Sequence, residues 1–194
     1  MKKYIVEALG TFTLTSAVCL SSVGKFPVST PVLAGLVVML FVYTAGHISG
    51  AHFNPAITLG AWSIKKIHGI DAFWYLVAQF FGSAIALLLV MTTVGLPTLN
   101  VSMNWMTAFA EFLGTMLFGF GVASLLYNKA PRDFAGVVAG GSLLLGISIA
   151  ALLGSNGVLN PAVAFGIGSL NLVYALAPIV GSVVGMNLYN YLNK

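Results

Sequence analysis

The tripeptide Asn-Pro-Ala occurs twice in this sequence, as Asn54-Pro55-Ala56 and as Asn160-Pro161-Ala162. Each copy closes a long apolar run and opens a short one. Asn is among the best N-cap residues and Pro fits the first helical position, so each copy predicts the start of a helix. A capping Asn uses its side-chain carbonyl on its own first turn, which leaves its amide NH₂ as a fixed pair of donors. Two such caps, each at the positive end of a helix dipole, would form a site that offers donors and repels cations.

The composition places the chain in a membrane. Of its 194 residues, 59% are hydrophobic and 6% are charged, and the mean hydropathy is +1.00. A water-soluble domain of this length could not cover its core with so few charges. The eight basic residues are too few and too scattered to indicate a nucleic-acid partner. The single cysteine, Cys19, excludes an internal disulfide framework. The histidines have no Cys or carboxylate at ligand spacing, and the sequence has no nucleophile–base pair or cofactor motif, so we expect no metal, no cofactor and no enzyme.

Six apolar runs are long enough to cross a bilayer, because about 20 helical residues span its ~30 Å core. They cover about residues 4–23, 31–46, 71–94, 106–127, 134–153 and 171–192. The lysines before the first run also suit a signal peptide, but Glu7 interrupts the apolar stretch and the run is long enough to span. The sequence therefore predicts an all-α membrane protein.

Two further apolar runs, from Pro55 to about Ser63 and from Pro161 to about Leu170, are much shorter. At roughly ten residues and 1.5 Å per residue, each helix would measure ~15 Å, or about half of the hydrocarbon core. Non-helical backbone before such a helix is tolerable where it lines a watery cavity. We therefore expect two re-entrant half-helices that enter from opposite faces and meet cap to cap.

The second half of the sequence repeats the first. The motif Glu-x-x-Gly-Thr at 7–11 recurs 104 residues later, at 111–115. The capping Asn recurs after 106 residues and Gly82-Ser83 after 99. Each repeat holds three spans, an odd number, so the second copy is expected to be inverted in the membrane. The sequence predicts one domain, 1–194, with repeat one at about 1–97 and repeat two at about 104–194.

The basic residues predict the orientation. If Lys2 and Lys3 are cytoplasmic, the turns that carry Lys65/Lys66 and Lys129/Arg132 are cytoplasmic too, as is Lys194. Seven of the eight basic residues then share one side and Lys25 lies on the other. The positive-inside rule therefore places both chain ends in the cytoplasm, in a multi-pass protein of the cell membrane.

Residues 46–60, Gly-His-Ile-Ser-Gly-Ala-His-Phe-Asn-Pro-Ala-Ile-Thr-Leu-Gly, resemble the first half-helix signature of the aquaporin, or major intrinsic protein, family. The second Asn-Pro-Ala and the paired Glu-x-x-Gly-Thr motifs match as well, so the resemblance covers essentially the whole chain. It implies a right-handed bundle of six transmembrane helices and two half-helices in the lipid bilayer. It also implies a homotetramer with one pore per subunit, and passive permeation of water and small neutral solutes.

The resemblance assigns roles to the segments before the caps. A ladder of backbone carbonyls, which accept hydrogen bonds from molecules in single file, would come from Gly50, Ala51, His52, Phe53, Asn156, Gly157, Val158 and Leu159. At the centre, Asn54 and Asn160 would donate to the oxygen of a passing water. A water held in this way interrupts a proton wire.

Two buried acids and two histidines receive supporting roles. Acidic residues inside a membrane are functional by default, but the resemblance makes Glu7 and Glu111 structural acceptors that hold the half-helices. His47 resembles the family's buried histidine behind the first loop, and His52 resembles one near the cytoplasmic mouth.

The chain departs from the family where selectivity is set. Water and glycerol channels usually carry Arg three residues after the second Asn, whereas this chain has Val163, followed by Ala164 in place of the glycerol facilitators' Asp. The other narrow positions map to Ala34, Ser148 and Gly157, none of which is aromatic or histidine. We expect a wide, weakly polar outer mouth that passes glycerol- or urea-like solutes, unless a side chain such as Phe53 or Phe165 narrows it.

Two other classes of function stay open at the sequence level. An inverted-repeat secondary transporter shares the architecture, but its coupling needs ionisable groups in the membrane, of which this chain has few. A structural membrane protein with little permeability is the third interpretation.

Overall fold

The computed structural model describes residues 1–23, 27–95 and 101–194. The helices are α1 (Lys2–Val23), α2 (Thr30–Ser49), α3 (Pro55–Ser63), α4 (Gly69–Thr93), α5 (Trp105–Leu126), α6 (Ala135–Leu152), α7 (Pro161–Gly166) and α8 (Leu172–Leu192), with a 3-10 turn η1 (Arg132–Phe134) before α6. Within the described residues, 6 helical segments are long and apolar enough to cross a membrane, so the six predicted spans are confirmed. Lys25, which we expected on the side opposite the other basic residues, lies outside the described residues.

The two short helices begin where the Asn-Pro pairs predict, but they differ in length. Helix α3 has 9 residues, as expected, whereas α7 has 6 and stops at Gly166 instead of about Leu170. The chain turns directly after α7, because Gly168 takes a left-handed φ of 72° and the Ser169 N–H donates back to the Ala164 carbonyl. Asn171 then caps α8. The apolar run was therefore read correctly as a half-helix, but its last residues belong to a turn.

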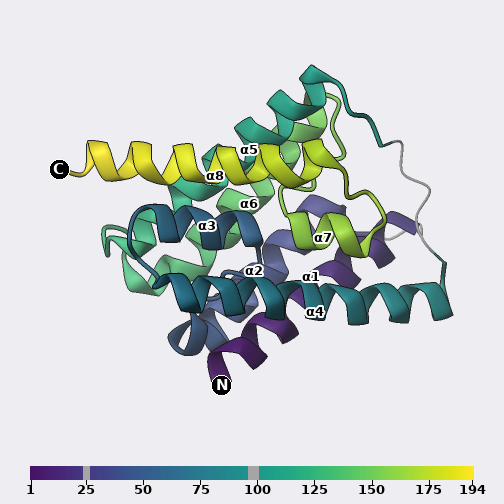
Figure 1. Ribbon diagram of the computed structural model, residues 1–194, viewed down its shortest axis with the longest axis horizontal. Helices are drawn as coiled ribbons and strands as arrows, with labels where there is room; N and C mark the ends of the chain where they lie inside the picture. The colour runs from purple at the N-terminus through teal and green to yellow at the C-terminus, as the bar shows by residue number, and fades with distance from the viewer. Residues whose placement is uncertain (24–26, 96–100) are drawn as a thin grey trace.

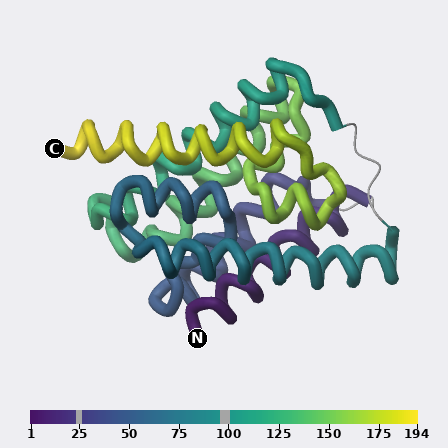
Figure 2. The backbone as a smooth tube through the Cα atoms, in the orientation of Figure 1, coloured from purple at the N-terminus to yellow at the C-terminus, as the bar shows by residue number. Residues whose placement is uncertain are grey.

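The helices of the two halves of the chain pack in the same pattern. Helix α1 packs against α2 and α4, and α5 packs in the same way against α6 and α8. Helices α2 and α6 join the halves, while α3 packs on α8 and α7 packs on α4. Figures 1 and 2 show α3 and α7 lying between the long helices α4 and α8. Each half-helix thus packs against the opposite half, which brings the two caps together.

Glycines allow the closest helix contacts. A Cβ at Gly82 of α4 would clash with the Ala8 carbonyl of α1, and a Cβ at Gly181 of α8 would clash with the Phe112 carbonyl of α5. Gly82 and Gly181 are the pair that recurs after 99 residues. Small residues of this kind let helix backbones approach closely in a membrane. The repeat in the sequence is therefore also a repeat in the packing.

The basic turns and both chain termini lie at one end of the bundle, which we call the basic end. There the Lys3 ammonium lies 2.8 Å from an Asp71 carboxylate oxygen, which joins the starts of α1 and α4. The Lys66 ammonium lies 4.0 Å from the centroid of the Tyr127 ring, and the Tyr127 hydroxyl donates to Asn190 Oδ1 over 2.6 Å. These contacts join the turn after α3 to the ends of α5 and α8, near the C-terminus marked in Figure 1.

Candidate functional site: the facing helix caps

Each half-helix is preceded by a loop with left-handed backbone. Helix α2 ends at Ser49 and is capped by Gly50, whose φ is 87°, and Ala51 and Phe53 follow with φ of 54° and 49°. In the second loop, Gly157 and Leu159 have φ of 63° and 55°. Ala51 and Phe53 correspond to Gly157 and Leu159 by the 106-residue repeat. Side chains with a Cβ rarely adopt this conformation, so both loops need strong local support.

The caps themselves are built as the Asn-Pro signal predicts. Asn54 Oδ1 accepts the Ala56 N–H over 2.8 Å. Asn160 Oδ1 accepts the N–H groups of Ala162 and Val163 over 3.0 and 3.2 Å. Both asparagines are 2% exposed. The half-helix dipoles therefore begin at buried caps in the middle of the protein.

The two caps are tied to one another across the repeat. Asn54 Nδ2 donates to the Leu159 carbonyl, and Asn160 Nδ2 donates to the Phe53 carbonyl, both over 2.9 Å. An amide nitrogen has two N–H groups, so each cap has one left to donate instead of the expected pair. The carbonyls of Phe53 and Leu159 are likewise already engaged, which weakens their place in the expected carbonyl ladder.

Glu7 of α1 holds the first loop with both carboxylate oxygens. Oε1 accepts the Ser49 hydroxyl over 2.7 Å and the His52 N–H over 3.0 Å. Oε2 accepts the Phe53 N–H over 2.7 Å and the Gln79 amide of α4 over 2.8 Å. The carboxyl group has no exposed surface. Glu7 therefore accepts hydrogen bonds from the first loop and from α4, as expected of a residue that holds the loop in place.

Glu111 of α5 makes the corresponding contacts in the second loop. Its carboxylate accepts the Val158 N–H over 2.9 Å and the Leu159 N–H over 2.7 Å, and it also accepts the Ser155 hydroxyl. The hydroxyl of Tyr174 accepts the Asn156 N–H over 3.3 Å. Both left-handed loops are thus held by a buried acid from the first helix of their own repeat.

The first loop has a polar cluster that the second lacks. Gln79 Nε2 also donates to Thr58 Oγ1 over 2.9 Å, and His52 Nδ1 lies 3.1 Å from the same hydroxyl. The repeat places Pro178, Ala164 and Val158 at the positions of Gln79, Thr58 and His52. Gln79 was not among the predicted site residues, although an amide inside an apolar span indicates a buried hydrogen-bond partner.

The two histidines occupy the opposite of their expected positions. His52 is 6% exposed, and its ring packs edge-on against Tyr75 behind the loop. His47 is exposed and lines a cavity near the basic end. Helix α2 continues to Ser49, so His47 lies on its last helical turn while His52 lies inside the loop. The interpretation of His47 as the buried loop support was therefore wrong.

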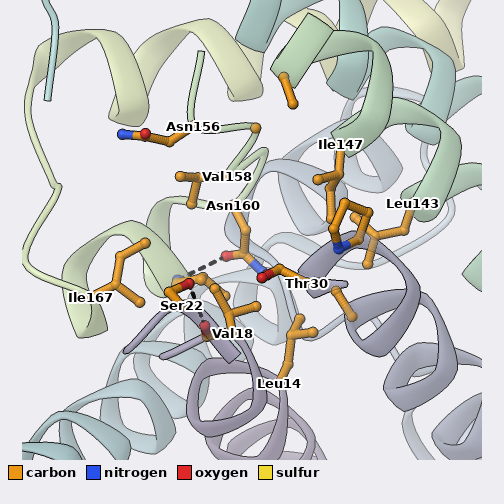
Figure 3. Close-up of a pocket in the computed structure, with 15 residues that line it drawn as sticks. Leu14, Val18, Ser22, Thr30, Leu143, Ile147, Asn156, Val158, Asn160 and Ile167 are labelled. Atoms are coloured by element: carbon orange, nitrogen blue, oxygen red, sulfur yellow. Dashed lines mark hydrogen bonds between the residues drawn. The ribbon is translucent and has the colours of Figure 1, made fainter. Parts of the chain in front are cut away.

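A first cavity, of about 170 Å³, lies beside the second cap, and we call it the Val163 cavity. Its wall consists of Leu14, Val18, Ser22, Thr30, Pro31, Ala34, Leu143, Ile147, Ala151, Asn156, Gly157, Val158, Asn160, Val163 and Ile167. Figure 3 shows Asn160 reaching the cavity among apolar side chains such as Val18, Leu143 and Ile147. None of the described residues in this wall is charged.

Three of the four expected constriction residues line this cavity, and one does not. Ala34, Gly157 and Val163 are in its wall, whereas Ile147 stands there in place of Ser148. The Ser148 hydroxyl donates to the Leu144 carbonyl of its own helix over 2.8 Å. The assignment of Ser148 was wrong by one residue, which turns a helical side chain by about 100°.

The aromatic residues that could have narrowed the mouth are held elsewhere. The Phe53 ring is fully buried and packs edge-on against Phe41, with centroids 5.3 Å apart. The Phe165 ring packs against Phe80 at 6.0 Å. Neither Phe53 nor Phe165 lines the Val163 cavity.

A second cavity, of about 510 Å³, lies on the other side of the caps, and we call it the Arg132 cavity. It is lined by Val38, Val42, Gly46, His47, Gly50, Ala51, Ile57, Phe118, Val122, Leu125, Leu126, Asn128, Arg132, Ala135 and Ala139. Ile57 follows Asn54 by three residues, as Val163 follows Asn160, so the two cavities meet equivalent faces of the half-helices. Among residues 1–23, 27–95 and 101–194, no three His, Cys, Asp or Glu side chains gather as a metal site.

Six membrane-crossing helices surround two half-helices whose caps meet between two cavities, and this arrangement defines a polytopic membrane channel. Residues 1–189 match the family described as Major intrinsic protein, and the chain belongs to that family. It is a passive membrane channel and not an enzyme.

The chain is similar both to a protein named as an aquaporin and to one named as a glycerol uptake facilitator. Aquaporin AqpM of Methanothermobacter marburgensis is 30% identical over 175 residues, a match that covers 72% of this chain and 71% of that protein. Glycerol uptake facilitator protein-like 6 of Lactiplantibacillus plantarum is 34% identical over 156 residues, with 72% and 71% covered. The solved structure of the aquaglyceroporin from Plasmodium falciparum has a TM-score of 0.69 at 19% identity and covers 100% of this chain and 95% of its own, so it shares the fold. Matches to curated relatives cover from 41% to 71% of the length of those proteins.

Proposed function

We propose that this channel passes small neutral solutes such as glycerol and urea as well as water. The observation that carries the proposal is the wall of the Val163 cavity, in which the described residues include no charged and no aromatic side chain. An arginine at this point would narrow the pore and supply fixed donors. Val163, Ala34 and Gly157 supply neither donors nor bulk, so the mouth is wide and weakly polar.

Permeation runs in single file past the paired caps. Backbone carbonyls of Gly50, Ala51, Asn156, Gly157 and Val158 offset part of the desolvation of a passing solute, since these residues line the two cavities. The free N–H of each capping amide donates to its oxygen at the centre. The helix dipoles oppose cations there, and proton exclusion depends mainly on this centre.

We propose an assembly and a sidedness for this chain, supported by the family and by the positions of the basic residues. The subunit forms a homotetramer with one pore per subunit, and the basic end faces the cytoplasm of a cell membrane. Cross-linking in detergent tests the tetramer. Labelling of a cysteine placed at Lys194, in intact cells and after lysis, tests the sidedness.

The decisive experiment is stopped-flow light scattering on proteoliposomes, challenged separately with sucrose, glycerol and urea. The expected result is rapid shrinkage in sucrose, followed in glycerol and urea by re-swelling that is faster than in protein-free liposomes. A channel that excludes both solutes as strictly as a water-only pore would contradict the proposal. Flux that saturates and follows an ion gradient would indicate a transporter instead.

A further inference from the structure

Arg132 is the only arginine of the sequence, and it lines the cavity at the basic end. Among the described residues, the wall of the Val163 cavity on the other side of the caps has no charged side chain. The described part of the chain therefore places a cationic side chain at the basic-end mouth and none in the wall of the Val163 cavity.

The backbone that presents Arg132 is anchored on the neighbouring helix. Arg132 begins the η1 turn, in which the Phe134 N–H donates to the Pro131 carbonyl over 3.0 Å. The Tyr43 hydroxyl of α2 donates to the Asp133 carbonyl, also over 3.0 Å. Gly136, in the first turn of α6, lies directly against the Tyr43 ring. The turn is thus fixed to α2 and α6, both of which contribute to the cavity wall.

Within the described residues, no acidic side chain forms an ion pair with Arg132, although Asp133 is the next residue in the sequence. In the part of the chain that the structure describes, the one ion pair joins Lys3 to Asp71. No acidic residue lines the Arg132 cavity. Lys66, at the same end, lies over the Tyr127 ring instead of in this cavity.

We propose that Arg132 is a selectivity residue that repels cations at the basic-end mouth, where it replaces the positive charge that Val163 does not supply. A charged side chain at the mouth of a pore changes the local concentration of ions but not that of neutral solutes. The inference rests on the proposed wide pore, because a mouth that is closed to ions at Val163 would need no second barrier.

The test compares cation leak in proteoliposomes that contain the wild type, Arg132→Gln, Arg132→Lys or Lys129→Gln. Lys129→Gln is the matched control, since it removes one positive charge from the same turn at a residue that does not line the cavity. Potassium or proton leak is read with an internal fluorescent indicator, and glycerol re-swelling is measured on the same vesicles. We expect Arg132→Gln to raise cation leak about three- to tenfold at low ionic strength, while Arg132→Lys and Lys129→Gln stay near the wild type.

Salt distinguishes an electrostatic barrier from a steric one. The screening length falls from about 30 Å at 0.01 M to about 3 Å at 1 M, so the excess leak of Arg132→Gln should shrink at high salt. In a protein that also carries Val163→Arg, the Arg132→Gln substitution should raise cation leak by less, because the arginine introduced at position 163 also repels cations in the same pore.

Chemical modification of the wild type tests the same side chain if Arg132→Gln does not fold. Butanedione modifies arginine side chains, and the sequence has a single one, so it addresses this site in the folded wild type. Arg132→Lys is its insensitive control.

The inference would be overturned if the cation leak in Arg132→Gln equalled that in the wild type or in Lys129→Gln. It would also be overturned if the excess leak of Arg132→Gln did not depend on the salt concentration. If the cation leak of the variants followed the expected pattern but no glycerol flux were measured, only the proposal that the channel passes glycerol would be contradicted.

Discussion

The side-chain amide of Asn54 donates a 2.9 Å hydrogen bond to the carbonyl of Leu159, the residue just before the second cap. The reciprocal bond joins Asn160 to the Phe53 carbonyl. Each cap thus fixes the loop that precedes the other, while its carbonyl oxygen holds its own helix start. The two caps are therefore one hydrogen-bonded unit, and a change at either asparagine acts on both loops.

Asn54→Asp and Asn160→Asp should raise cation leak through the pore. An ionised Asp accepts at the helix start but cannot donate to the opposite carbonyl, and it adds a negative charge where the dipoles repel cations. We expect a rise on the order of tenfold or more, because unit charges about 4 Å apart interact by roughly 4 kcal/mol at an effective dielectric of 20. Ion flux in proteoliposomes measures it.

Asn104→Asp is the matched control for the cap variants. Asn104 caps α5 by accepting the Thr107 N–H over 2.8 Å, but it is exposed and far from the cavities. Unchanged ion conductance in a folded Asn54→Asp/Asn160→Asp double variant would contradict the placement of the caps in the pore.

Glu7→Ala should destabilise the protein more than Glu7→Gln. Gln keeps an acceptor for the loop, whereas Ala leaves the N–H groups of His52 and Phe53, the Ser49 hydroxyl and the Gln79 amide without their partner. An unsatisfied buried donor costs about 1–3 kcal/mol. Thermal unfolding in detergent measures the difference, and the same order is expected for Glu111. Equal melting temperatures of the Gln and Ala variants would refute the loop-holding role.

The caps and spans could be predicted because their signals are local. Asn-Pro fixes a helix start by the chemistry of two adjacent residues, and a run of about 20 apolar residues has no stable alternative to a membrane helix. Endings were harder to predict. The apolar residues after Gly166 did not indicate that the chain turns at Gly168. Helix α2 extends to Ser49, so His47 lies on the helix and is exposed, whereas His52 lies in the loop and is buried.

Contacts between distant residues could not be predicted from the sequence. The bonds from Gln79 to Glu7 and Thr58 join α4, α1 and α3, and no local pattern contains all three. The same limit applies to Ile147 and Ser148, since both are adjacent residues of one apolar helix and only packing decides which faces the cavity.

Gln79→Leu should destabilise the first loop selectively. Leu is close to Gln in size but removes the donors to Glu7 and Thr58, so the stability should fall by about 1–3 kcal/mol. Pro178 occupies the equivalent position in α8, so the second loop has no such contact to lose. Hydrogen exchange should rise in the segment 50–54 and stay unchanged in 156–160. A uniform rise in both loops would argue against a local role for Gln79.

Val163→Arg should convert a wide pore into a narrow one. Val163 is 2% exposed in the wall of the Val163 cavity, so a longer side chain there must extend into that cavity. Arginine adds bulk, fixed donors and a positive charge at once. We expect glycerol and urea flux to fall about tenfold or more and proton leak to fall as well, while osmotic water flux survives. Stopped-flow light scattering and an internal pH indicator measure the three fluxes on one vesicle preparation.

Val163→Met separates the bulk of the arginine from its charge. Met adds length and volume without donors or charge. If the size of the mouth limits solutes, both variants reduce glycerol flux, but only Val163→Arg reduces proton leak, because repulsion needs the charge. Glycerol flux that neither variant changes would mean that the narrowest point lies elsewhere. The paired caps would then be the sole filter, and the wide outer mouth would no longer explain which solutes pass.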